Sequence, residues 1–171
     1  MATMDIVKYG HSALNKKCKP VSRFSDIHMV IENMFDSMYE AEGIGLAANQ
    51  VGLNMNLFVI DVTHTDEAED THVFINSKIL AYNGEKSFFQ EGCLSLPGIA
   101  LDVERPEKIV LKYQTADQEW HEEEFEGLLS RAIQHEMDHL NGIFIIDRVS
   151  KIEKIKYKSE LKKLAADSKY N

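Results

Sequence analysis

The segment from Leu128 to Leu140 constrains the fold more than any other part of the chain. Its apolar residues recur with the spacing of an α-helix and cover most of the helix circumference. Two adjacent stripes run along it, one through Leu128, Ala132, His135 and His139 and one through Leu129, Ile133, Met137 and Leu140. A helix that is apolar on nearly all sides has to be buried, so we expect it to lie in the interior against a β-sheet and to end at Gly142.

The same segment contains the pattern His-Glu-x-x-His, formed by His135, Glu136 and His139. Residues four apart project from one face of a helix, so both imidazoles can bind one metal ion, and the glutamate between them can reach a water on that metal. The alternative is a pair of ordinary helix histidines. It is disfavoured because two imidazoles and a carboxylate are costly to bury unless they are paired or bound. The pattern predicts a metal site with Glu136 as general base.

A catalytic metal site of this kind needs a third protein ligand and one open position. Asp138 lies on the wrong side of the predicted helix to supply that ligand. Cys93 is the best candidate, because a thiolate is stable beside a cation and Gly92 lets the backbone approach closely. Considered alone, Cys93 is more often explained as a buried apolar cysteine. The other cysteine, Cys18, is assigned no role.

The rest of the pattern predicts an α+β fold, in which strands precede the buried helix and one further helix lies toward each end of the chain. The expected elements are a helix at 25–43, an ordered small-residue loop at 43–52, strands at 57–62, 72–76 and 86–91, a hairpin of 108–114 with 119–125, and a lysine-rich helix at 150–166. No repeat or linker interrupts the chain, so we expect residues 1–171 to form a single domain.

Composition limits the possible partners. The 171 residues are 44% hydrophobic, enough for one core, and carry a formal net charge of −9. Such a chain is repelled by phosphate backbones and anionic lipid, so we expect no specific nucleic-acid recognition and no membrane binding. There is no apolar run of about 20 residues to span a bilayer, and no apolar N-terminal run like that of a secretory signal. We therefore expect a cytoplasmic protein.

Three separated segments resemble the signature motifs of the peptide deformylase family. They are GIGLAANQVG at 43–52, EGCLSLP at 91–97 and QHEMDHLNG at 134–142, and their order and spacing also agree. The resemblance is to the bacterial type and implies an antiparallel or mixed sheet wrapped around the metal-binding helix. It also implies the activity of a metal-dependent amide hydrolase that removes the N-formyl group from the formyl-methionine of newly made polypeptides and releases formate.

The resemblance implies a role for each motif residue. The metal ligands, with water as the fourth, would be Cys93, His135 and His139. Glu136 would act as general base on the water that attacks the formyl carbon. Gln50 and the backbone N–H of Leu94 would form the oxyanion hole, whereas Gln50 considered alone is better explained as a turn hydrogen-bonder.

The resemblance also implies supporting and substrate-binding residues. Glu91 and Arg105 would form an ion pair that supports the cysteine loop, the alternative being two solvated charges. The pocket for the methionine side chain would use Ile44, Phe89 and Leu128, with Gly45 offering backbone hydrogen bonds to the peptide. Two positions depart from the family pattern: Arg131 stands where an apolar pocket residue is expected, and Ala100 where members can carry a larger basic residue.

The predicted donor set of one cysteine and two histidines accepts Zn²⁺, Fe²⁺, Co²⁺ or Ni²⁺, and the resemblance favours Fe²⁺ in cells. Charge is segregated along the chain, because residues 151–171 carry a net +4 and residues 1–150 carry −13. This basic end could make a transient contact with ribosomal RNA. The preferred interpretation is a solvated helix packed by Ile152, Ile155 and Leu161.

Two other classes of protein share parts of this pattern. A His-Glu-x-x-His endopeptidase has the same metal, base and hydrolytic step, but a thiolate ligand argues against it. A structural Cys/His metal site is normally closed by four protein ligands. The sequence offers no convincing fourth ligand, and a structural site has no use for Glu136.

Overall fold

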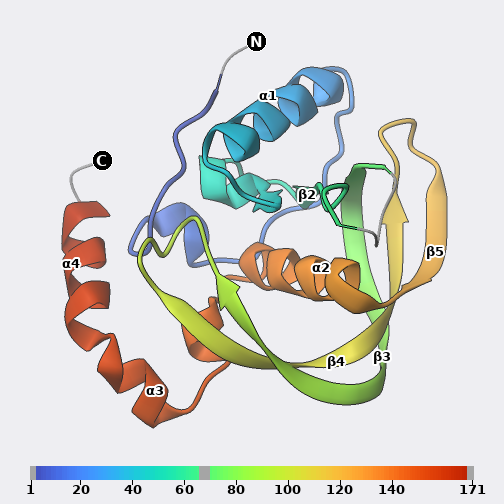
Figure 1. Ribbon diagram of the computed structural model, residues 1–171. Coiled ribbons are helices and arrows are strands. Elements are labelled where there is room, and N and C mark those ends of the chain that lie inside the picture. The colour runs from blue at the N-terminus through green and yellow to red at the C-terminus, as the bar shows by residue number, and fades with distance from the viewer. Residues whose placement is uncertain (1–2, 66–69, 169–171) are drawn as a thin grey trace.

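One antiparallel sheet organises the computed structural model, which describes residues 3–65 and 70–168 (Figure 1). The strands lie in sequence order across the sheet, and every neighbouring pair is antiparallel. They are β1 (Gly45–Ala47), β2 (Leu57–Ile60), β3 (His72–Gly92), β4 (Ala100–Gln114) and β5 (Trp120–Phe125). The predicted hairpin is confirmed, since Gln114 pairs with Trp120.

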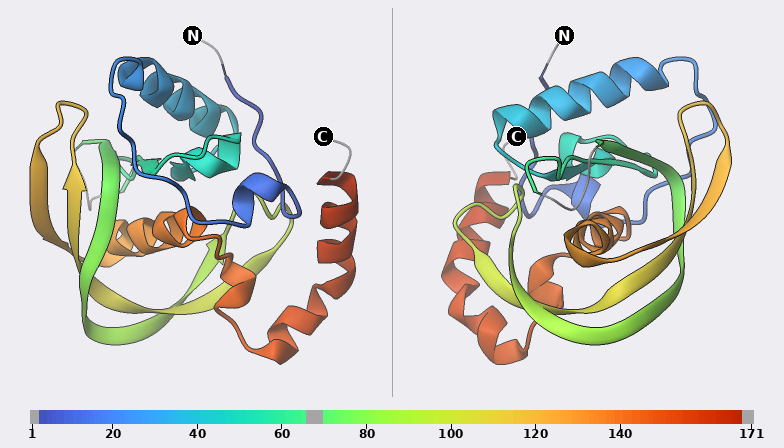
Figure 2. Two further views of the ribbon diagram at one scale, coloured as in Figure 1. Left: turned by 180° about the vertical axis from the view of Figure 1, so that it is seen from behind. Right: turned by 45° about the vertical axis from the view of Figure 1, so that its right-hand side comes forward.

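Strand β3 is a single strand of 21 residues, although two separate strands were predicted at 72–76 and 86–91. Three shifts of register interrupt its pairing with β4, between Ile75 and Lys78, between Ile79 and Ala81, and between Asn83 and Lys86. Such irregularities bend a strand and increase its twist. The long β3–β4 ribbon therefore curves around the helix at 127–140, which is seen nearly end-on in the right-hand view of Figure 2.

The α-helices lie in the regions that the sequence predicts, with changed limits, whereas the short 3-10 helices were not predicted. The helices are α1 (Ile27–Glu40), α2 (Gly127–Leu140), α3 (Lys151–Lys156) and α4 (Lys158–Ser168), together with the short 3-10 helices η1 (Ser12–Leu14), η2 (Ala48–Val51) and η3 (Ile145–Asp147). The predicted loop at 43–52 contains β1 and η2. No helix in the described residues is both long and apolar enough to cross a membrane.

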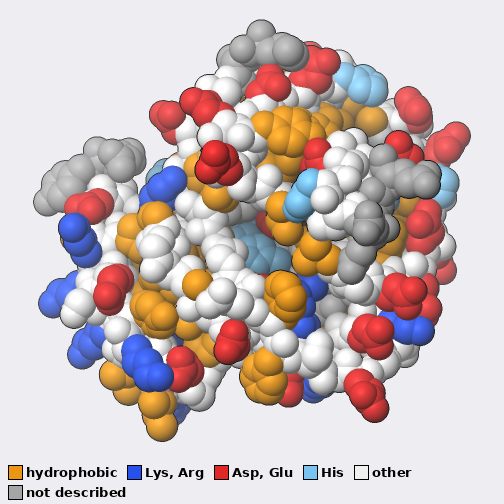
Figure 3. All heavy atoms as spheres, in the orientation of Figure 1, with side chains coloured by type: hydrophobic (Ala, Val, Ile, Leu, Met, Phe, Trp, Pro, Cys, Tyr) orange, Lys and Arg blue, Asp and Glu red, His pale blue; other side chains and the backbone are white. Residues whose placement is uncertain are grey.

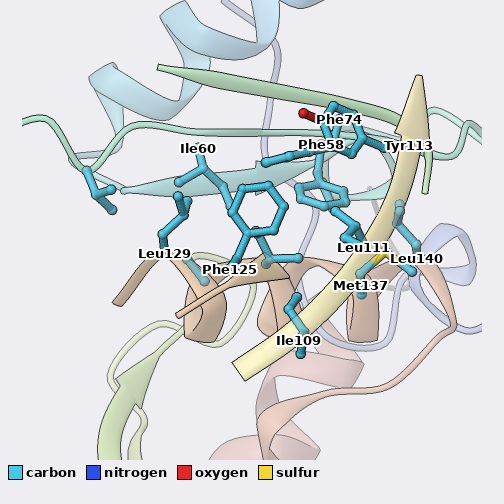
Figure 4. Packing of buried hydrophobic residues seen from close by; sticks show 14 of the residues in the cluster. Phe58, Ile60, Phe74, Ile109, Leu111, Tyr113, Phe125, Leu129, Met137 and Leu140 are labelled. Carbon is cyan, nitrogen blue, oxygen red and sulfur yellow. The ribbon is translucent and has the colours of Figure 1, made fainter. Parts of the chain in front are cut away.

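Helix α2 lies against the sheet and supplies one side of the main core. The other side comes from residues on all five strands, most of which are labelled in Figure 4. The buried side chains that meet there include Phe58, Ile60, Phe74, Ile109, Leu111, Tyr113, Phe125, Leu129, Met137 and Leu140. This packing confirms the prediction of a buried helix wrapped by sheet.

Helix α1 covers the opposite face of the sheet at β2. Successive residues of a strand point to opposite faces, so Phe58 and Ile60 pack toward α2 while Leu57 and Val59 pack in the cluster that contains α1 residues. All four residues of β2 are consequently buried. The short strand β1, at the edge beside β2, is held between the same two layers and carries the small-residue segment toward α2.

The C-terminal region corrects one prediction. A single helix packed by Ile152, Ile155 and Leu161 was expected, but the helix is divided at Tyr157, and Ile152 and Ile155 are 71% and 66% exposed. Leu161 alone of the three is buried. The reason is that α3 is only six residues long and extends from the body, whereas α4 packs beside η1 and the strand ends through Leu161 and Leu164.

Candidate active site

Helix α2 brings both histidines and the glutamate of the His-Glu-x-x-His pattern to one place in the interior. His139 and Glu136 are buried, and His135 is nearly so. The nitrogen atoms of His135 and His139 and the sulfur of Cys93 all lie within 4.8 Å of one another. In the described residues these three side chains form a group that could hold a metal ion, and they are the three that were predicted.

Cys93 reaches the histidines because β3 ends at Gly92, directly before it. The Cys93 Sγ atom lies 3.1 Å from Nε2 of His139. Burial raises the pKa of the Cys93 thiol, but the charge of His139 and hydrogen bonds from both histidines outweigh burial and hold that pKa well below its ordinary value. The thiolate, which is the form that binds metal, is thus favoured by its surroundings.

Glu91 fixes the orientation of His135. Its Oε1 atom lies 3.0 Å from Nδ1 of His135, which leaves Nε2 free to bind a metal. Arg105 donates to both oxygens of the same carboxylate, at 2.8 and 3.0 Å, so the predicted Glu91–Arg105 ion pair is present and buried. Burial opposes ionisation of Glu91, but the hydrogen bonds from His135 and Arg105 prevail and lower its pKa to about 2.

Asp138 does not belong to the group of Cys93, His135 and His139 but to an ion-pair network with two arginines. Its carboxylate accepts a hydrogen bond from Arg105 at 3.0 Å and others from Arg148 at 2.6 and 3.1 Å. Arg105 therefore links Asp138 to Glu91, and through Glu91 to His135. This arrangement agrees with the exclusion of Asp138 as a ligand, because its oxygens are already engaged with two arginines.

The side chain of Glu136 is buried, and one of its two carboxylate oxygens makes no hydrogen bond in the described residues. Its Oε1 atom has no hydrogen-bond partner in the described residues, which is costly for a buried carboxylate unless a ligand or water engages it. Burial is the main cause that raises the pKa of Glu136. The backbone of Gly45 passes so close that a Cβ there would lie 2.6 Å from Oε2 of Glu136. Only glycine permits this approach.

Gln50 and Leu94 lie beside the same group. The Oε1 atom of Gln50 accepts a hydrogen bond from the Ala47 N–H at 2.9 Å, and its Nε2 atom lies 3.2 Å from Ser95 Oγ and 3.8 Å from Cys93 Sγ. The amide is thereby held with its donor end toward the cysteine. The backbone N–H of Leu94 has no hydrogen-bond partner among the described residues.

A cavity of about 410 Å³ opens over these groups. Its walls include all four of the residues predicted to bind substrate, which are Ile44, Gly45, Phe89 and Leu128, together with Gln50, Glu91, Cys93, Leu94, Arg131, His135 and Glu136. Figure 3 shows a hollow in the middle of this face with histidine side chains, in pale blue, at its floor. Ala100 is not among the lining residues.

The donor set and its surroundings fit a catalytic metal. One thiolate and two imidazoles are the borderline-soft donors that zinc and ferrous iron accept. The second nitrogen of His135 is bonded to a carboxylate, as is usual for a metal-ligating histidine. A fourth position would face the cavity, where the free oxygen of Glu136 lies.

Comparisons with known proteins agree with this geometry. The family model described as polypeptide deformylase matches residues 3–155. The chain belongs to the peptide deformylase family. A peptide deformylase of Chlorobium luteolum is 44% identical over 166 residues, which are 95% of this chain and 87% of that protein. The solved peptide deformylase of Thermus thermophilus is 35% identical with a TM-score of 0.90, covering 96% of this chain and 99% of the other, and that of Plasmodium falciparum is 37% identical with a TM-score of 0.89, covering 97% and 98%.

Three contacts in this peptide deformylase site were not predicted. Arg131 donates to Glu91 Oε2 at 2.8 Å, Ser95 accepts from Gln50, and Asn49 donates to the backbone oxygen of His139. A signal for the first did exist in the sequence. Arg131 precedes His135 by four residues, so both project from one face of α2 and can reach the same carboxylate.

Proposed function

We propose that this chain hydrolyses the N-formyl group of N-terminal formyl-methionine in newly made polypeptides and releases formate. The single observation that carries the proposal is the grouping of Cys93, His135 and His139 beside the unpartnered buried carboxylate of Glu136, at the floor of an open cavity. Metal-assisted hydrolysis requires this set of groups. Membership of the peptide deformylase family supports the same reaction.

Cys93, Nε2 of His135 and His139 would hold one divalent ion, which we propose to be Fe²⁺ in cells, with Zn²⁺, Ni²⁺ or Co²⁺ able to replace it. When bound, such an ion acts as a Lewis acid and lowers the pKa of a coordinated water from about 16 toward about 7. The protein contributes orientation. Arg105 holds Glu91, and Glu91 holds the ring of His135 with its other nitrogen directed at the site.

Glu136 would act as the general base. Its free Oε1 takes the proton of the attacking water, and the same oxygen then delivers that proton to the departing amine nitrogen when the C–N bond breaks. Burial supports both steps. It raises the pKa of Glu136, so that this pKa lies closer to neutral pH than the pKa of a solvated glutamate does. The products are formate and a free N-terminus.

Gln50 and Leu94 would stabilise the negative oxygen that develops on the formyl group. The Nε2 atom of Gln50 carries two hydrogens, and one bond to Ser95 Oγ leaves the other available. The N–H of Leu94, which has no partner among the described residues, is the second donor. Donors that are already in place lower the barrier because they need no rearrangement in the transition state.

Substrate would bind in the cavity with its first side chain between Ile44, Phe89 and Leu128. Gly45 would offer backbone hydrogen bonds to the peptide. Its position supports this role, because β1 is an edge strand and pairs with β2 on one side only. An edge strand has unpaired backbone groups that an extended peptide can use.

We further propose that residues 1–171 form one domain that acts in the cytoplasm on chains emerging from ribosomes. Contact of the basic α3–α4 region with ribosomal RNA is the more specific form of this proposal, and a solvated helix is the alternative. The exposure of Ile152 and Ile155 removes the packing argument for that alternative at α3. No specific recognition of nucleic acid or membrane is proposed, in view of the net charge of −9.

The proposed function is tested by formate release from an N-formyl-Met peptide, using protein purified without oxygen whose metal content is measured on the same sample. We expect rapid release, iron in the site, and no internal cleavage of the same peptide without the formyl group. Internal cleavage would instead support an endopeptidase. A tightly bound metal with neither reaction would support a structural site.

A further inference from the structure

A second cavity lies next to the active-site cavity. It has a volume of about 320 Å³ and is lined in part by Ser87, Pro106 and Glu107 from the β3–β4 ribbon. Three residues line both cavities, namely Phe89, Leu128 and Arg131. They therefore form the wall between the proposed pocket for the first substrate side chain and this outer cavity.

Arg131 is the fixed part of that wall. Its Nη1 atom donates to Glu91 Oε2 at 2.8 Å and to the Val103 oxygen at 2.9 Å, and its Nη2 atom donates to the Ser87 oxygen at 2.8 Å. These three contacts tie α2 to both strands of the ribbon. The Arg131 side chain is only 11% exposed.

Phe89 depends on Arg131 for part of its position. The Phe89 residue is 55% exposed, and the guanidinium carbon of Arg131 lies 5.5 Å from the centre of its ring. A cation at this distance from an aromatic face is attracted to it. Removal of the Arg131 side chain would therefore open the wall directly and release Phe89 as well.

We propose that Arg131 is a specificity-determining residue that ends the pocket for the first side chain and limits the length it accepts. The inference rests on the proposed function. Arg131 shares the Glu91 carboxylate with Arg105 and is also bonded to the backbone oxygens of Val103 and Ser87, so the inference concerns the length of the substrate side chain and not its charge. Beyond Arg131, the outer cavity, which Leu128 and Pro106 help to line, would extend the pocket if Arg131 were shortened.

The test compares two formylated peptides that differ only in the first residue, methionine or the longer, straight-chain 2-aminooctanoic acid. For each enzyme the measured quantity is the ratio of kcat/KM for the longer substrate to kcat/KM for the methionine substrate. The variants are Arg131→Ala, Arg131→Leu and Arg131→Met. Leucine and methionine both remove the guanidinium and have equal numbers of heavy atoms, but the unbranched methionine reaches further.

We expect the ratio to rise in Arg131→Ala by about tenfold or more, the effect of roughly one methylene in an apolar pocket. Arg131→Leu should show a smaller rise in this ratio, and the ratio for Arg131→Met should stay closest to that of the unmodified chain. Metal content and the unfolding midpoint are measured for every variant. If Arg131→Ala does not fold, the comparison of leucine with methionine carries the test.

Two results would overturn the inference. One is an unchanged ratio in the alanine and leucine variants. The other is a methionine variant whose ratio shifts as far as that of the alanine variant, since loss of the Glu91 contact would then be the cause. Failure of the unmodified chain to release formate from formyl-Met would refute the proposed function instead. In that case the ratio of the equilibrium binding constants for the same two peptides would test the role of Arg131.

Discussion

Gln50 has both ends of its side-chain amide held, and this supports the role in the oxyanion hole that we propose for it. The oxygen accepts from the Ala47 N–H, and the nitrogen lies near Ser95 and Cys93. A glutamine that only stabilised the local turn would need the hydrogen bond from the Ala47 N–H alone. The contacts of its nitrogen with Ser95 and Cys93 orient a donor toward Cys93, where we expect a negative oxygen to develop in the proposed reaction.

We predict that Gln50→Ala lowers kcat by about 10²–10³-fold, the usual loss for one oxyanion donor. The physical reason is that the donor is buried and already oriented. Ser95→Ala is the matched control, since it removes a neighbour of the Nε2 atom and leaves the donor in place, so its loss should be much smaller. Steady-state formate release measures both, and a near-normal rate in Gln50→Ala would remove this residue from the mechanism.

The grouping of His135, His139 and Cys93 was predictable because the sequence carries a local signal at each of the two segments that form it. Four-residue spacing on an apolar helix is enough to bring His135 and His139 together, and Gly92 before Cys93 marks a close approach of backbone. The ion pairs of Asp138 with two arginines were not predictable. They depend on where β4, which carries Arg105, and the end of η3, which is followed by Arg148, pass the side of α2 that carries Asp138, and both paths are tertiary properties.

At the scale of elements, β1 acts by approaching α2 closely. The Cβ that any other residue would place at Gly45 lies 2.6 Å from Glu136 Oε2, which is the far end of a flexible side chain. The glutamate can therefore move aside without unfolding either element. The cost of a larger residue at position 45 would therefore fall on Glu136, the proposed base, rather than on the fold.

We predict that Gly45→Ala lowers kcat by about 10²-fold, as expected when a reacting group is displaced by about 1 Å, with little change in the unfolding midpoint. Gly52→Ala should show the opposite result, a lower unfolding midpoint with little change in kcat. A Cβ there meets nothing within 4 Å, but its φ of +82° strains any other residue. Rates and thermal melts of both variants check this, and a stable, fully active Gly45→Ala would contradict it.

Strand β3 shows where sequence patterns fail for an element. Its two ends were predicted, but the middle residues, at 77–85, show no simple alternation of apolar and polar side chains. Most of that stretch is exposed, and two of the three register shifts fall within it. Because the alternation signal requires one buried face and an unbroken register, the sequence could not show that both ends belong to one strand.

For the whole molecule, strands of the one sheet contribute residues to all three buried clusters, and this supports our proposal of one domain. The main cluster contains a titratable group, Tyr113, whose hydroxyl donates to Glu123 at 2.9 Å. Burial first, and then the Glu123 carboxylate, raise the pKa of Tyr113. The folded chain therefore favours the protonated phenol more than the unfolded chain does.

We predict that the free energy of unfolding falls as the pH rises above about 10, where tyrosine ionises in unfolded chains. Below that pH the stabilisation from Tyr113 is fully present. Tyr113→Phe should make this fall shallower than Tyr82→Phe does, the latter being a matched control at an exposed tyrosine. Denaturant melts from pH 9 to 12 measure the slopes. Equal slopes in both variants would contradict the prediction, and two separate transitions would contradict the single domain.

The central claim is that Glu136 moves the proton in a metal-dependent deformylation. The most direct measurement is formate release from an N-formyl-Met peptide by the unmodified chain and by Glu136→Gln, each with its bound metal quantified. Our account predicts full metal content in the variant with a loss of about 10²–10⁴-fold in kcat, the usual contribution of a general base. A variant that retains its metal and releases formate at the rate of the unmodified chain would contradict it.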